Sequence, residues 1–183
     1  MTNFLHNFWF VQSIGILAIV FSIWSWNSNI RKKILELQAV NALLLTIHYY
    51  LLGAMAGALM SAIILVRNVV YEKKTNHPWA AHKVWYYVFI FLSLAGTFYS
   101  WKGIVTLLPA IAVIIANEGL YRDKPDQIRV FILIACFLWI PYTIVVHSYS
   151  GLASNIIAAL GIMIGIYRLD RKNKAEIKPT ATI

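Results

Sequence analysis

Apolar residues run through most of this 183-residue chain in long, almost uncharged stretches that short polar segments separate. Seven stretches of about 17–20 residues can be recognised, at 8–26, 34–52, 54–71, 84–101, 104–120, 130–147 and 151–167. A helix of that length crosses a hydrocarbon core about 30 Å thick. The pattern therefore predicts an integral membrane protein with seven spanning helices.

These spans are predicted to be helices, so the expected fold class is all-α. Backbone amides inside a bilayer find no water to bind, which leaves only helices or a closed β-barrel. Barrel strands alternate apolar and polar residues, whereas these stretches are continuously apolar. The connections are too short to form a soluble domain. We expect one membrane domain over residues 1–183, with 169–183 as a polar tail.

The net charge of +9 is concentrated on alternate connections. Fifteen of the sixteen Lys and Arg residues lie on every second connection, at the helix ends beside it or in the tail, and the other connections contain only Lys102. Cytoplasmic segments carry this excess, so the N-terminus is predicted outside and the C-terminus in the cytoplasm. The distribution explains the basic charge without nucleic acid as a partner. Membrane lipids are the expected partner, and a specific anionic-lipid site stays open.

The first stretch is not expected to be a cleaved signal peptide. Residues 1–8 contain no Lys or Arg, whereas a signal peptide begins with a positively charged segment. We therefore count this stretch as the first spanning helix.

The stretches are grouped as three, one and three, and the two groups of three resemble each other. A shift of 94 residues pairs Gly57 with Gly151 and Ser61 with Asn155. Three helices and one connecting helix give both groups the same orientation, so a two-fold axis along the membrane normal would relate them, with a central cavity between. We expect parallel triple-helix repeats at 8–71 and 104–168, joined by a linker helix at 84–101.

Polar residues follow one face of the second stretch. Gln38, Asn41, Leu45 and His48 are spaced by 3, 4 and 3 residues. At about 100° per residue they form one stripe. Polar side chains in a membrane must face protein or water. The stripe either bonds neighbouring helices or lines a cavity for a polar solute. His48 itself is either a packing residue or a group that couples to protons.

The second half adds further candidates. Asn155, equivalent to Ser61 in the repeat, is predicted either to bind a solute or to join two helices, because an amide both donates and accepts hydrogen bonds. Trp139 either stacks on a flat ligand or packs. Pro109 and Pro141 are expected to bend the fifth and sixth helices, as static features or as hinges.

No motif indicates an enzyme, a metal site or a cofactor. The chain has no phosphate loop, no metal-ligand spacing, no Ser/His/Asp set and no paired buried carboxylates. Cys136 is the single cysteine, so no intramolecular disulfide can form, and it is expected to be a small packing residue. Glu36 and Glu118 lie one turn from basic residues and are expected to form interfacial ion pairs.

Several short motifs resemble those of a known family. They are Tyr50-Leu51-Leu52-Gly53, Gly57-Ala58, the segment from Ser61 to Asn68 with Arg67, Leu107-Leu108-Pro109, and Trp139 ahead of Gly151 and Arg168. In these motifs the chain resembles the bacterial inner-membrane family known as YgjV-type, over about residues 8–170. The resemblance implies a place in the bacterial inner membrane, and it implies no activity.

A wider likeness is to the three-plus-one-plus-three transporters, which include SWEET-type sugar facilitators, PQ-loop proteins and nicotinamide-riboside transporters. In those families a solute binds between two triple-helix bundles, often between polar residues on the third and seventh helices. Ser61 and Asn155 fall on those helices. The first two helices here contain no proline, and no Pro-Gln dipeptide occurs. The alternating-access mechanism of those families therefore does not follow from the likeness.

The favoured function is a small-solute transporter or facilitator. Its predicted solute-binding residues are Gln38, Asn41, His48, Ser61, Trp139 and Asn155. The alternative is a non-transporting membrane scaffold that binds lipid or a partner protein. The identity of the solute and the formation of a homo-oligomer stay open.

Overall fold

The structure is a computed structural model, and it describes residues 8–26, 28, 30–122 and 125–170. In these residues it contains helices and no strand, which agrees with the all-α prediction. The long helices are α2 (Phe8–Trp26), α3 (Arg31–Leu51), α4 (Met55–Glu72), α6 (Val84–Tyr99), α7 (Leu107–Tyr121), α8 (Pro125–Val145) and α9 (Tyr149–Gly165). Short elements are η1 (Lys73–Thr75), α5 (Pro78–Ala81), η2 (Ile104–Thr106) and η3 (Ile166–Asp170).

Six of the described helices are long and apolar enough to cross a membrane, and α6 is shorter. Its 16 residues extend about 24 Å, less than a typical hydrocarbon core. The expected span 84–101 ends early because Ser100 caps the helix and Gly103, at φ 106°, turns the chain. The seventh span therefore stays a prediction.

Two helices begin at least three residues earlier than their apolar stretches. The second stretch was expected to start at residue 34, but α3 begins at Arg31. The sixth was expected at residue 130, but α8 begins at Pro125. Charged residues are tolerated where a helix leaves the hydrocarbon, and proline suits the first position of a helix. Apolar length marks the membrane-embedded part of a helix rather than its ends.

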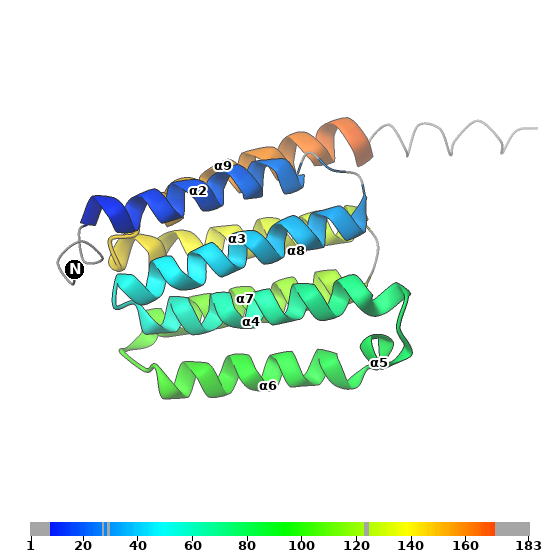
Figure 1. Cartoon of the computed structure of the whole chain (residues 1–183), viewed down its shortest axis with the longest axis horizontal. Coiled ribbons are helices and arrows are strands. Elements are labelled where there is room, and N and C mark those ends of the chain that lie inside the picture. The colour runs from blue at the N-terminus through cyan, green and yellow to red at the C-terminus, as the bar shows by residue number, and fades with distance from the viewer. Residues whose placement is uncertain (1–7, 27, 29, 123–124, 171–183) are drawn as a thin grey trace, which may run out of the picture.

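The helices form two layers (Figure 1). One layer holds α2, α3 and α4, and the other holds α9, α8 and α7. Helix α2 packs against α9, and α4 packs against α7. Helices α3 and α8 occupy the middle of the two layers, and α6 lies at the edge, against α4 and α7. Figure 1 also shows that α2, α4, α7 and α9 run in one direction, opposite to α3, α6 and α8.

The surface is apolar and much of the interior is polar, as expected for a protein in lipid. Large side chains such as Trp9, Phe91 and Phe98 are exposed, whereas Asn68 and Asn117 are buried. Much of the remaining core consists of alanine, which lets helix backbones approach closely.

Helix α6 is attached to the bundle by polar contacts. Tyr86 Oη donates to Glu118 Oε2 at 2.7 Å, and Asn117 Nδ2 donates to the Tyr86 carbonyl at 3.2 Å. Asn117 Oδ1 accepts in turn from Tyr71 Oη at 2.7 Å. Glu118 also pairs with Arg122 at 2.6 Å, which confirms the ion pair expected there. The two bonds of Tyr86 fix α6 to α7.

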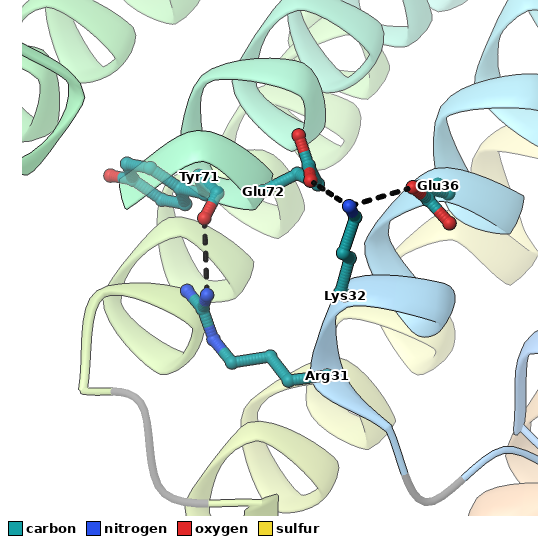
Figure 2. Close-up of polar contacts among 5 residues, drawn as sticks. All are labelled: Arg31, Lys32, Glu36, Tyr71 and Glu72. Carbon is teal, nitrogen blue, oxygen red and sulfur yellow. Dashed lines mark hydrogen bonds and ion pairs between the residues drawn. The ribbon is translucent and has the colours of Figure 1, made fainter. Parts of the chain in front are cut away.

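Basic residues at the start of α3 bind the end of α4 (Figure 2). Arg31 Nη1 donates to the Tyr71 carbonyl at 3.1 Å. Lys32 Nζ lies 3.5 Å from Glu72 Oε1 and 3.9 Å from Glu36 Oε1, which confirms the expected pair of Glu36. A cation at a helix C-terminus also stabilises the helix dipole. Some of the positive charge therefore has a structural role.

Candidate functional site

A cavity of about 110 Å³ lies in the centre of the bundle, between α3 and α8. Its lining comes from six helices, namely α2, α3, α4, α7, α8 and α9. The volume is close to that of the engineered cavity of about 150 Å³ that binds benzene. The space therefore fits only a small organic solute.

Five of the six predicted solute-binding residues line this one cavity. They are Gln38, Asn41, Ser61, Trp139 and Asn155. Leu45, the apolar member of the stripe on α3, lines it as well. The structure therefore brings together residues that lie far apart in the sequence.

The three predicted amide side chains of the cavity, Gln38, Asn41 and Asn155, each bond to the protein through their nitrogen. Gln38 Nε2 donates to Ser25 Oγ at 3.1 Å, and Asn41 Nδ2 donates to the Ala18 carbonyl at 2.7 Å. Asn155 Nδ2 donates to the Gly151 carbonyl of its own helix at 2.9 Å. These bonds hold the amides in place at the cavity wall. Gln38 and Asn41 also join α3 to α2, so the stripe bonds a neighbouring helix as well as lining a cavity.

The sequence analysis missed Arg67 and Asn68, which also line the cavity. Both are 2% exposed. Arg67 had been counted among the cations that set orientation, but its guanidinium lies inside the bundle, where Nη1 donates to the Val113 carbonyl at 3.1 Å. The signal was present, because Ser61, Ile64 and Arg67 are spaced three residues apart and share a helix face. An arginine inside an apolar stretch normally faces the protein interior.

Three aromatic rings close one end of the cavity. Tyr49 and Trp139 are stacked with their ring centroids 5.8 Å apart. Tyr142 packs edge-on against both, at 6.1 and 5.7 Å. Tyr142 also lines a second cavity of about 240 Å³, which includes Lys102. This aromatic cluster of Tyr49, Trp139 and Tyr142 therefore lies between the two cavities.

The expectation that His48 lines the cavity is wrong. Its Nδ1 lies 2.8 Å from the Val11 carbonyl, and its Nε2 lies 2.8 Å from Ser148 Oγ. A carbonyl only accepts, so we assign the proton to Nδ1 and an accepting role to Nε2. Both ring nitrogens are satisfied, and the residue is fully buried beyond Tyr49. His48 is a packing residue that connects α2, α3 and the turn before α9.

Only one of the two prolines lies in the interior of a helix. Pro109 falls in the first turn of α7, which begins at Leu107, so it does not interrupt the interior of that helix as expected. The first turn of a helix tolerates proline because its N–H groups have no partner within the helix. Pro141 lies inside α8, which continues to Val145. It stands between Trp139 and Tyr142 of the aromatic cluster.

The cavity residues do not form a metal site. No group of three His, Cys, Asp or Glu side chains among the described residues could hold a metal ion. Cys136 lines the cavity and is buried, as expected of a small packing residue. The chemistry available to a solute is therefore that of amides, hydroxyls, aromatic rings and one guanidinium.

Residues 9–173 match a family model named Imp-YgjV and described as bacterial inner membrane protein. The match spans most of the chain and confirms the resemblance found in the sequence. No curated protein and no solved structure matches the chain. The wider likeness to SWEET-type and PQ-loop transporters therefore stays a prediction. With its apolar helices and this match, the chain belongs to the Imp-YgjV family of bacterial inner membrane proteins.

Proposed function

We propose that this protein is a small-solute transporter or facilitator and that its solute binds in the central cavity. One observation carries the proposal: helices from both halves of the chain line the central cavity, and the aromatic cluster lies between it and a second cavity. Two cavities in series through a membrane bundle are the arrangement that a permeation path requires. Movement of Tyr142 and its neighbours would join them.

Two reciprocal contacts support the parallel repeat. Tyr142 of α8 packs against Gly57 of α4, where a Cβ would lie 2.9 Å from its hydroxyl. Tyr49 of α3 packs against Gly151 of α9, where a Cβ would lie 2.7 Å from its hydroxyl. A two-fold axis that exchanges α3 with α8 and α4 with α9 exchanges these two contacts. We therefore propose two parallel triple-helix repeats related by this axis, with α6 as the linker.

With the N-terminus outside, the central cavity extends from the middle of the bundle towards the cytoplasmic side. Its lining extends from Tyr49 and Trp139 to Trp26, Ile34 and Ile128, near the connections that carry most of the basic residues. The second cavity then lies towards the outside. In this proposal the aromatic cluster is the outer gate.

The alternative is a non-transporting scaffold. One observation favours it: Gln38 and Asn41 bond to α2 through their amide nitrogens, as purely structural residues would. A scaffold predicts that these residues contribute to stability alone. It also predicts that no small solute binds in the cavity.

A binding and uptake experiment separates the two functions. The purified protein is screened by thermal shift against two sets of probes, each matched in size within the set. One set is benzoate, benzamide and benzylamine, and the other is lactate, lactamide and 1-amino-2-propanol. Any probe that binds is then tested for uptake into proteoliposomes. Transport predicts saturable uptake that Ala135→Leu, which fills the cavity, abolishes. Ala95→Leu, at an exposed position on α6, is the matched control.

The outcomes are distinct. Saturable uptake that Ala135→Leu abolishes and Ala95→Leu preserves supports a transporter. Binding without uptake supports a solute-binding scaffold. If neither set of probes binds, the proposed site is wrong.

A further inference from the structure

The central cavity contains a buried cation that has no anionic partner among the described residues. Arg67 is 2% exposed. Among the described residues that line the cavity there is no Asp or Glu. Its guanidinium has five N–H donors, and its one hydrogen bond to a described residue is the bond from Nη1 to the Val113 carbonyl. Nε is buried without a hydrogen-bond partner.

Such a charge is costly in the absence of a compensating group. Burial removes a guanidinium from water, and one neutral carbonyl does not replace the lost hydration. Arginine keeps its charge even when it is buried, so loss of a proton does not relieve the cost. An anion in the cavity would provide both the countercharge and acceptors for the free N–H groups.

Other side chains of the cavity also indicate which kind of solute it would bind. Trp26 Nε1 is a second buried donor without a described partner, and Trp26 also lines the cavity. Much of the remaining wall is apolar, with Ile64, Ile132 and Ala135 among its residues. A fully hydrated inorganic ion is a poor match for such a wall. A small organic molecule with one anionic group and an apolar part matches it better.

The second cavity has the same electrostatic character. It is lined by Lys102, and no Asp or Glu is among its described residues. The proposed path thus has Arg67 in one cavity and Lys102 with His147 in the other, and no carboxylate among the described lining residues. A cation would meet unfavourable charge at both places, whereas an anion would be attracted to both.

We propose that the solute is a small organic monocarboxylate and that the Arg67 guanidinium binds its carboxylate. The inference rests on the proposed solute site in the central cavity and adds the chemical class of the solute. A carboxylate accepts two parallel N–H bonds from a guanidinium, an arrangement that is both strong and directional. Arg67 is the residue in the cavity able to form it.

Arg67 could instead serve only as a structural link between α4 and α7 through Val113. That role predicts that its replacement lowers stability and leaves any solute preference unchanged. The test therefore measures a preference between isosteres as well as stability.

The full chain is placed in nanodiscs of phosphatidylcholine, which adds no anionic lipid. Binding of benzoate, benzamide and benzylamine, and of lactate, lactamide and 1-amino-2-propanol, is measured by thermal shift and calorimetry. We expect a carboxylate to bind at least about tenfold more tightly than its amide, because a charge-assisted bond is stronger than a neutral one. Arg67→Gln should remove this preference, and Arg67→Lys should retain part of it.

Two further variants keep the test decisive. Arg168→Gln makes the same chemical change at an exposed residue of η3 and should leave the preference intact. If Arg67→Gln does not fold, Arg67→Lys is compared with the unmodified chain, and the preference for carboxylate should fall while binding of the neutral amide is unchanged.

Equal binding of carboxylate and amide, or a preference that survives Arg67→Gln, would overturn the inference while leaving the proposed site intact. Binding of only the amine probes would do the same. If the unmodified chain binds none of the probes, including the neutral ones, the proposed function itself is wrong.

Discussion

The backbone N–H of Gly57 donates a hydrogen bond to Tyr142 Oη over 2.7 Å and so joins α4 to α8. Gly57 lies in the first turn of α4, where N–H groups have no partner within the helix. The bond therefore satisfies a buried donor and holds Tyr142 in the aromatic cluster. It is also one of the two reciprocal contacts between the halves of the chain.

The close approach at Gly57 predicts a destabilised Gly57→Ala variant. The added Cβ would lie 2.9 Å from both Tyr142 Oη and Tyr49 Cγ, so the rings must move. We expect a loss of about 1–3 kcal/mol in the free energy of unfolding, measured by denaturant titration in detergent. Gly161→Ala is the matched control, since its Cβ would lie 3.8 Å from the nearest atom. A Gly57→Ala variant as stable as Gly161→Ala would contradict this packing.

Two asparagines of the cavity are expected to differ in their contribution to stability. Asn41 bonds to a neighbouring helix, through the Ala18 carbonyl, so Asn41→Ala should cost about 0.6–2 kcal/mol. Asn155 bonds within its own helix, so Asn155→Ala should cost less than about 1 kcal/mol. Asn155→Ala should nevertheless abolish solute binding. A normal affinity in this variant would remove Asn155 from the site.

Replacement of His48 should lower stability and leave solute binding in the cavity unchanged. His48→Ala removes bonds to Val11 and Ser148 and leaves a buried space, so we expect a loss of about 2–4 kcal/mol. His77→Ala, at an exposed position, should have little effect. Variants that fold should keep the solute affinity of the unmodified protein. A large change in affinity without a loss of stability would show that His48 belongs to the binding site.

The orientation can be tested by labelling with a membrane-impermeant maleimide in intact cells. With the N-terminus outside, Lys102→Cys should react from outside, and Arg122→Cys should react only after the membrane is permeabilised. Cys136 is buried and should give little background. Lys33→Cys should behave as Arg122→Cys does. Reversed labelling at these positions would invert the proposed direction of the cavities.

Most of the helices and part of the site could be predicted from the sequence. Apolar length is a local property, so the stretch 8–26 coincides with α2 and the others with helices whose ends differ by a few residues. Where the ends differ, as at Arg31 and Pro125, the helix begins before its apolar stretch. The spacing of Gln38 and Asn41 also indicated a shared face.

The tertiary structure alone decided what covers each polar side chain. His48 continues the stripe of Gln38 and Asn41 in sequence, yet Val11 and Ser148 take both of its ring nitrogens. Arg67 reads in sequence as one more basic residue near a helix end, yet the fold buries it in the cavity. Helical spacing specifies a face of one helix, and only packing determines which helices meet that face. The apolar stretches that favour lipid can therefore be recognised in the sequence, whereas the cavity forms only when six helices pack together.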